Sequence, residues 1–277
     1  MLNIIKADLF RILKGKGIYI IIILLFLLSL MSAYTVSPLN VGLNVSGDTT
    51  ENYGLSDEWL EKLYSVKSMS ETRDILINHG RYEVDVANVV HNNNMYYFFI
   101  AVVVFVLCCD FSNGTIKNTV STNISKKKYY FSKLLLAIGL GTIITFLNVY
   151  FAYFSNLFMN GNSFVSSLSN ITLLTIRQLP LLYAIISVLI TIAVIVRKTS
   201  IYNGISIPLL MLFQLILGFM NTFNLPKWIY NYEFETALGK LCLNPTNTYI
   251  MQTLSLWTIV FIITTIIGYS YFKKKDI

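Results

Sequence analysis

Residues that could perform catalysis are few in this chain of 277 residues, and their spacing indicates no catalytic site. No spacing links His79 or His91 to other ligands, and the cysteines, at 108, 109 and 242, form no CxxC or Cys/His pattern typical of a metal site. The apolar stretches contain no paired carboxylates of the kind an intramembrane protease or acyltransferase needs. No GxxxxGK[ST] loop is present to hold a nucleotide phosphate. The sequence therefore predicts no catalytic, cofactor-binding or metal residue on this chain.

A polar segment between two apolar runs has chemistry suited to binding a partner. It begins at Asp110, which ends an apolar run, and it reaches Lys133. Residues 112–114, Ser-Asn-Gly, favour a turn. We expect a short helix over 115–122, followed by a helix that Ser125 caps and that continues through the lysines. The alternative is an ordinary solvated basic loop.

The first 16 residues have an amphipathic pattern, and we name residues 1–16 the elbow segment. At helical spacing one face is apolar and the other basic, although Asp8 and Phe10 fit this pattern less well. The apolar face is formed by Leu2, Ile4, Ile5, Leu9, Ile12 and Leu13, and the basic face by Lys6, Arg11 and Lys14. Such a helix lies in the membrane interface, with its cations toward anionic headgroups. Residues 15–17, Gly-Lys-Gly, then permit a sharp turn; the alternative is a simple basic anchor.

Long apolar runs must position these two segments, because only 13% of the residues are charged. Six runs approach or reach the roughly 20 apolar residues that a helix needs to cross a bilayer. They lie at about 17–34, 95–110, 131–158, 173–196, 201–223 and 252–272. Helices are expected because lipid offers no partner to backbone polar groups. The sequence thus predicts an all-α, polytopic membrane protein with six transmembrane helices.

The distribution of charge predicts the orientation of the spans. The elbow segment, the 110–133 segment, the 197–198 link and the C-terminal tail hold 14 of the 21 lysines and arginines, whereas the 35–94 segment is acidic. Basic residues favour the inner side of a membrane, which places both termini in the cytoplasm and residues 35–94 outside. The net charge of +7 does not indicate nucleic acid, since the basic residues flank apolar runs.

At residues 108–135 the chain resembles the type 2 permeases of ATP-binding-cassette exporters. Those proteins have an acidic residue at the end of helix 2, a Gly-Thr pair, a short coupling helix and a basic run into helix 3. The matching residues here are Asp110, Gly114-Thr115, Ser125-Lys126-Lys127 and Lys133. The elbow segment, the six spans and the cytoplasmic termini agree with the family layout. Family members also carry short helices dipping in between spans 5 and 6, for which residues 224–251 are suitable.

The resemblance implies partners and assigns roles. A separate cytoplasmic ATPase subunit would bind ATP and Mg²⁺, and a second permease subunit, identical or different, would complete the transporter. The coupling loop, 111–130, and the elbow segment would contact the ATPase. The expected coupling residues are Asp110, Gly114, Thr115, Ile116, Lys117, Asn118 and Thr119, and the expected elbow residues are Ile5, Leu9, Arg11 and Leu13.

Three polar residues inside the apolar runs are candidates for a substrate path. Arg177 lies near the outer end of its run, where it either reaches the headgroups or pairs with Glu233 or Glu235. Asn148 and Gln214 either face a substrate or hydrogen-bond between helices.

The predicted function is export of amphipathic or antimicrobial peptides for immunity or secretion. This substrate class is implied by the resemblance, and the composition favours the cell membrane of a Gram-positive bacterium. The alternative is a membrane sensor subunit whose 35–94 segment binds a ligand without transport.

Overall fold

The computed structural model describes residues 1–35, 95–116, 124–160, 167–222, 231–242 and 246–274, and within these ranges every regular element is a helix. The predicted all-α class is confirmed for this part of the chain. Most of the 35–94 segment and three expected coupling residues, Lys117, Asn118 and Thr119, lie outside the described residues.

The elements, in chain order, are α1 (Leu2–Lys14), α2 (Gly17–Thr35), the 3₁₀ turn η2 (Met95–Tyr97), α7 (Phe98–Val103), the π-helical η3 (Val104–Cys108), α8 (Cys109–Ser112), α10 (Lys126–Asn160), α11 (Leu168–Val196), α12 (Thr199–Thr222), α14 (Phe234–Cys242) and α15 (Asn247–Lys274). The segments η2, α7, η3 and α8 follow one another without a break. Together they occupy the position of the second predicted span.

Five helical segments of the described chain are long and apolar enough to cross a membrane. They correspond to predicted spans 1, 2, 3, 4 and 6. A helix also covers the fifth predicted span, because α12 has 24 residues. The described side chains of α12 end at Leu212, so its passage across a membrane stays a prediction.

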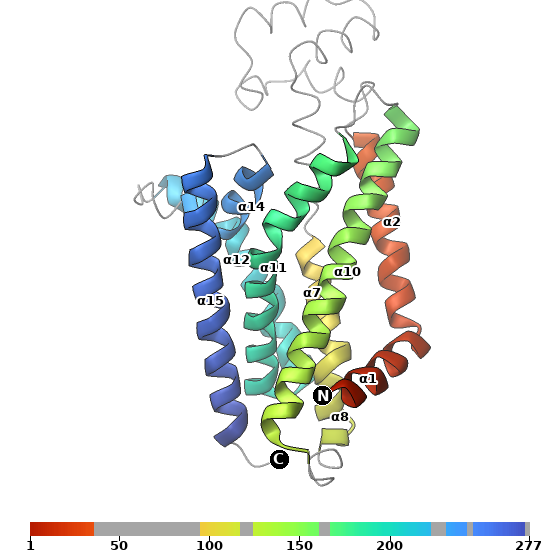
Figure 1. The fold of residues 1–277 in the computed structure, drawn as a ribbon, viewed down its shortest axis with the longest axis vertical. Helices are drawn as coiled ribbons and strands as arrows, with labels where there is room; N and C mark the ends of the chain where they lie inside the picture. Colours follow the sequence, from red (N-terminus) through yellow and green to blue (C-terminus); the bar gives the residue numbers. More distant parts are fainter. Residues whose placement is uncertain (36–94, 117–123, 161–166, 223–230, 243–245, 275–277) are drawn as a thin grey trace, which may run out of the picture.

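The helix α11 lies at the centre of the bundle and packs against α10, α12 and α15 (Figure 1). Its closest partner is α15, to which it is joined by polar side chains between apolar ones. The hydroxyl groups of Ser187 and Thr264 are 2.5 Å apart, and the Thr191 hydroxyl donates to the Thr264 carbonyl at 2.9 Å. A helix that is apolar on all sides can be buried in this way at the core of a membrane bundle.

The helix α10 has 35 residues and begins earlier than the predicted third span, which started at residue 131. Its additional first turns contain the basic residues 126–128. The predicted cap is confirmed: the Ser125 hydroxyl accepts a hydrogen bond from the Lys128 amide at 3.3 Å. At roughly 1.5 Å per residue, α10 exceeds the thickness of a hydrocarbon core and extends beyond it.

Both ends of the described chain lie at one end of the bundle, which we name the near end (Figure 1). There the Lys126 ammonium donates to the Lys273 carbonyl at 3.3 Å, and the Ser112 and Thr199 hydroxyls are 2.9 Å apart. The short helix α14 lies at the opposite end, the far end, beside the start of α15 (Figure 1). The chain therefore starts and finishes on the same side of the bundle.

The turn between α1 and α2 is formed differently from the expectation. Gly15 has φ −78° and ψ 147°, an extended conformation open to any residue, so the turn does not depend on glycine there. Gly17 is required for close packing instead. A Cβ atom at Gly17 would lie 2.5 Å from Cζ of Phe105.

Candidate functional site

A cluster of charges, three of them buried and Arg11 partly exposed, joins α1, α8 and α10, and we name it the charge cluster: Asp8, Arg11, Asp110 and Lys133. The Lys133 ammonium lies 2.6 Å from Oδ2 of Asp8 and 2.5 Å from Oδ2 of Asp110. Arg11 pairs with Oδ1 of Asp110 and lies 3.2 Å from Oδ1 of Asp8. Each carboxylate thus contacts both cations, and the four formal charges cancel.

Tyr129 completes the charge cluster from α10. Its hydroxyl donates to Oδ2 of Asp110 at 2.6 Å, and the Lys133 ammonium lies 5.1 Å from the centre of its ring. Since Tyr129 and Lys133 are four residues apart, both side chains emerge on one face of α10. Asp110 receives hydrogen bonds from residues on two other helices.

Burial makes this pairing necessary. Lys133 is 1% exposed, Asp110 3% and Asp8 8%. An ionised group removed from water is strongly unfavourable unless it is paired and hydrogen-bonded. Removing one member of a buried pair costs about 3–5 kcal/mol because the other charge is left without a partner. The charge cluster therefore fixes the positions of three chain segments relative to one another.

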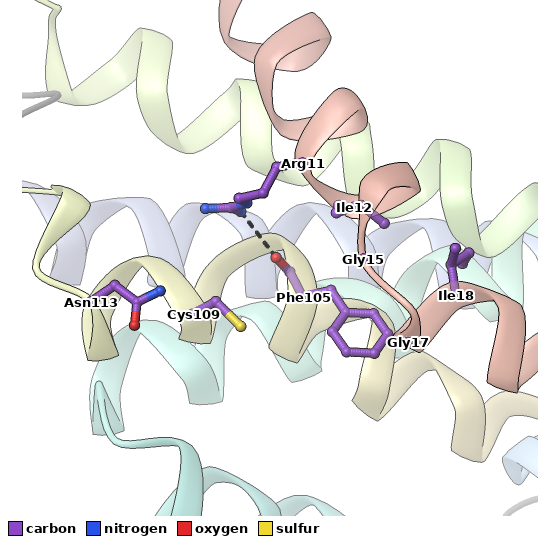
Figure 2. Close-up of a pocket in the computed structure, with 8 residues that line it drawn as sticks. All are labelled: Arg11, Ile12, Gly15, Gly17, Ile18, Phe105, Cys109 and Asn113. Carbon is purple, nitrogen blue, oxygen red and sulfur yellow. Dashed lines mark hydrogen bonds between the residues drawn. The ribbon is translucent and has the colours of Figure 1, made fainter.

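Arg11 connects the charge cluster to the irregular part of the second helical segment. One guanidinium nitrogen donates to the Phe105 carbonyl at 3.1 Å, within the π-helical η3 (Figure 2). Burial lowers the pKa of Arg11, but the hydrogen bond and charge of Asp110 outweigh it, so the pKa is raised. π-helical turns are often found at functional sites. Here Arg11 of the elbow segment hydrogen-bonds directly to that turn.

The end of α8 has a second set of neighbours at the turn between α11 and α12. The Arg197 guanidinium lies 5.6 Å from the centre of the Phe111 ring, and Arg197 itself adopts φ 58°, the left-handed conformation that ends α11. Ser112 contacts Thr199 as described above. A displacement of α8 would therefore change its contacts with both the elbow segment and the α11–α12 turn.

The expected coupling residues follow α8 directly. Gly114 has φ +66°, the left-handed conformation that favours glycine, so the predicted turn is present. The Thr115 hydroxyl donates to the Asp110 carbonyl at 3.3 Å, and Ile116 is buried. Within the 111–130 segment, Phe111 and Ser112 belong to α8 and residues 126–130 to α10, in agreement with the helix expected after Ser125.

The elbow residues do not all have the predicted surroundings. Ile5 and Leu9 are partly buried against the core, whereas Leu13 is 47% exposed. Arg11 was expected to face the headgroups but pairs with Asp110. Asp8, which fitted the amphipathic pattern poorly, is the acidic residue that receives Lys133.

A cavity of about 190 Å³ lies next to the charge cluster, between the elbow segment and the second helical segment. It is lined by Arg11, Ile12, Gly15, Gly17, Ile18, Phe105, Cys109 and Asn113. Figure 2 shows the apolar side chains at one end, and Cys109 and Asn113 toward the other. Its lining is mostly apolar. Arg11, which belongs to the charge cluster, is the charged residue of the lining.

The three candidates for a substrate path do not form a described site. Asn148 is 1% exposed on α10, and its amide nitrogen has no hydrogen-bond partner among the described residues. Arg177 is partly exposed on α11 and forms no ion pair with any described carboxylate. Its expected partners are otherwise engaged, since Glu233 caps α14 through the Glu235 and Thr236 amides at 3.0 and 2.9 Å. The side chain of Gln214 lies outside the described residues.

Glu235 and Gln178 hold α14 at the far end. The Tyr96 hydroxyl donates to Glu235, and the Gln178 amide donates to the Leu238 carbonyl at 3.3 Å and contacts the Cys242 sulfur at 2.7 Å. Gln178 is fully buried. Sequence reasoning overlooked it because its neighbour Arg177 carries the more conspicuous charge.

Sequence reasoning also overlooked the roles of Asp8, Tyr129 and Lys133. The available signal was an acidic residue within an otherwise basic helix, one turn from an arginine. The sequence places Lys133 only in the basic run of the 110–133 segment, whereas it lies two turns inside α10.

Comparison with models of known protein families gives no match, and no curated protein matches the chain.

Proposed function

We propose that this chain is the permease subunit of an ATP-driven exporter, the reading favoured by the resemblance at residues 108–135. The observation that carries the proposal is the charge cluster. It rigidly links the elbow segment, the end of α8 and the start of α10, which are the elements that a cytoplasmic ATPase would press against. A force that the ATPase exerts on the elbow segment or on the end of α8 would be transmitted to the bundle through these paired charges.

The proposal includes six transmembrane helices with both termini in the cytoplasm, in a multi-pass protein of the cell membrane of a Gram-positive bacterium. The path of the chain supports a sixth crossing, by α12. The helix α12 begins beside α8 at the near end, and α15 begins beside α14 at the far end, so the chain between them passes from one end of the bundle to the other (Figure 1). A second permease subunit and two ATPase subunits complete the transporter. ATP and Mg²⁺ bind to the ATPase, and this chain performs no hydrolysis itself.

The proposed substrates are amphipathic or antimicrobial peptides. The described exposed side chains of α2 and α15 are predominantly large and apolar, which suits contact with lipid. A peptide already lying in the membrane would reach the bundle at one of these two helices, which lie on opposite flanks of the bundle (Figure 1). Export would protect the cell or secrete the peptide.

The test compares Arg11→Gln with Lys14→Gln, both in the elbow segment. Arg11 belongs to the charge cluster, whereas Lys14 is exposed. The permease is purified from its native membrane with associated subunits, reconstituted in vesicles and supplied with a labelled cationic amphipathic peptide. We expect ATP-dependent peptide movement for the unaltered protein and Lys14→Gln, and ATP hydrolysis without movement for Arg11→Gln. Absence of a nucleotide-hydrolysing subunit, or peptide binding without ATP-dependent movement, would overturn the proposal and favour a sensor.

A further inference from the structure

The cavity beside the charge cluster has the build of a site for an amphiphile. Its inner wall is apolar, formed by Ile12, Ile18 and Phe105, and its other end carries the Asn113 amide and the Cys109 thiol (Figure 2). An apolar cavity of about 150 Å³ is enough to bind a molecule such as benzene. The volume of about 190 Å³ therefore suits a short length of alkyl chain and not a whole lipid or peptide.

The cavity is kept open by the residues at the α1–α2 turn. Gly15 and Gly17 line it without side chains, and Gly17 packs directly against the Phe105 ring. The conformation of Gly15 would accept any residue, so its lack of a side chain matters for space and not for the backbone. The π-helical η3, which carries Phe105, forms the opposite wall.

The charges that flank Gly15, one of the lining residues, indicate the head of the ligand. The charge cluster is neutral as a whole, so Arg11 contributes no net charge there. Lys14 and Lys16 flank Gly15 on either side and are exposed, and none of the described ion pairs includes them. No acidic residue lies between Arg11 and residue 47 of the sequence. The exposed chain around Gly15 is therefore positively charged, and an anionic group complements it.

We propose that this cavity holds the end of one acyl chain of an anionic phospholipid, with the headgroup between Lys14 and Lys16. The elbow segment supports this occupant, because its exposed apolar side chains, Leu2, Phe10 and Leu13, suit the headgroup and acyl boundary of a bilayer. The lipid fills the space between the elbow segment and η3. This inference does not depend on the proposed transport function.

The native cysteines provide a probe of occupancy. Cys109 lines the cavity and is partly exposed, whereas Cys108 and Cys242 are buried. Burial raises the pKa of the Cys242 thiol to about 12, which further disfavours its alkylation. An acyl chain in the cavity shields Cys109 from N-ethylmaleimide, so the alkylation rate of this single thiol reports the ligand.

The experiment measures alkylation of Cys109 by mass spectrometry of the full-length protein in lipid nanodiscs. One set contains phosphatidylcholine alone and the other a mixture with phosphatidylglycerol. We expect several-fold slower alkylation with phosphatidylglycerol for the unaltered protein. The double variant Lys14→Gln, Lys16→Gln removes the difference, and the control Lys127→Gln, Lys128→Gln, which removes two exposed lysines of α10, retains it.

A second measurement covers the case in which Cys109 does not react in either lipid. Phospholipid that remains bound after detergent exchange is quantified by mass spectrometry. We expect retained phosphatidylglycerol for the unaltered protein and the Lys127/Lys128 control, and its loss from the Lys14/Lys16 variant. Alkylation that proceeds at the same measurable rate in both lipids, equal retention in all variants, or protection by phosphatidylcholine alone would overturn the proposal.

Discussion

At the near end of the bundle, four charged side chains from three helices pair with one another, whereas at the far end the polar contacts of α14 are single hydrogen bonds beside buried apolar side chains. Lys133 and Asp110 each contact two oppositely charged partners. Gln178 and Glu235, in contrast, join α14 to α11 and to η2 by separate bonds. Because a buried charge that loses its partner costs several kcal/mol, we expect α1, α8 and the start of α10 to move together. The far end can exchange its bonds individually.

The largest effect is expected at Lys133. Lys133→Met leaves Asp8 and Asp110 buried with Arg11 as their shared cation, and it should lower the free energy of unfolding by about 3–5 kcal/mol. Unfolding of purified protein in detergent measures this. The control is Lys127→Met, the same change in the exposed first turn of α10, which should stay within about 0.5 kcal/mol of the unaltered protein. Similar stability of both variants would contradict the near-end description.

The turn after α8 is the next place to test. Gly114→Ala meets no atom within 4 Å of its new Cβ, so its only cost is the left-handed backbone, about 1–2 kcal/mol. Gly139→Ala is the matched control, because it also meets no atom within 4 Å but lies in α10 with ordinary helical angles. It should stabilise the helix by up to about 1 kcal/mol. Opposite signs in thermal unfolding would support the turn, and equal signs would refute it.

A smaller effect is expected at the far end. Gln178→Leu removes the donor to the Leu238 carbonyl, and hydrogen bonds between membrane helices contribute about 0.6 kcal/mol on average and rarely more than about 1.7. The control in the same unfolding assay is Gln252→Leu, which removes an exposed hydrogen bond from the Tyr232 hydroxyl and should cost less than Gln178→Leu. A loss at Gln178 as large as that at Lys133 would remove the contrast between the two ends.

The smallest effect is a dependence on pH at Glu233. Burial raises the pKa of this carboxyl, and amide hydrogen bonds from Thr236 and Glu235 offset only part of that rise. The folded state then binds the proton more tightly than the unfolded chain, so stability declines as pH rises from the ordinary glutamate pKa through the raised one. Glu233→Gln should flatten this slope between pH 4 and the raised pKa. If stability increased over this pH range in the unaltered protein but not in Glu233→Gln, the raised pKa of Glu233 would be contradicted.

Much of the fold could be predicted from the sequence, because long apolar runs have few alternatives in lipid. Five predicted spans correspond to helical segments that can cross a membrane, and the Ser125 cap and the Gly114 turn follow from local chemistry. The candidate site was predicted only in part. The sequence singles out Arg11 as an elbow residue and Asp110 as a coupling residue, but it does not pair them.

The sequence by itself determined the elements of this protein, since hydropathy, capping and the left-handed preference of glycine act within a few residues of the chain. Only the tertiary structure decided which charges meet. Asp8 and Lys133 are 125 positions apart, and Arg11 and Asp110 are 99 apart. The packing of α1 against α8 and α10 removes these side chains from water, and desolvation then makes their pairing obligatory. No local pattern carries that information, because the same residues on separate helices would remain solvated.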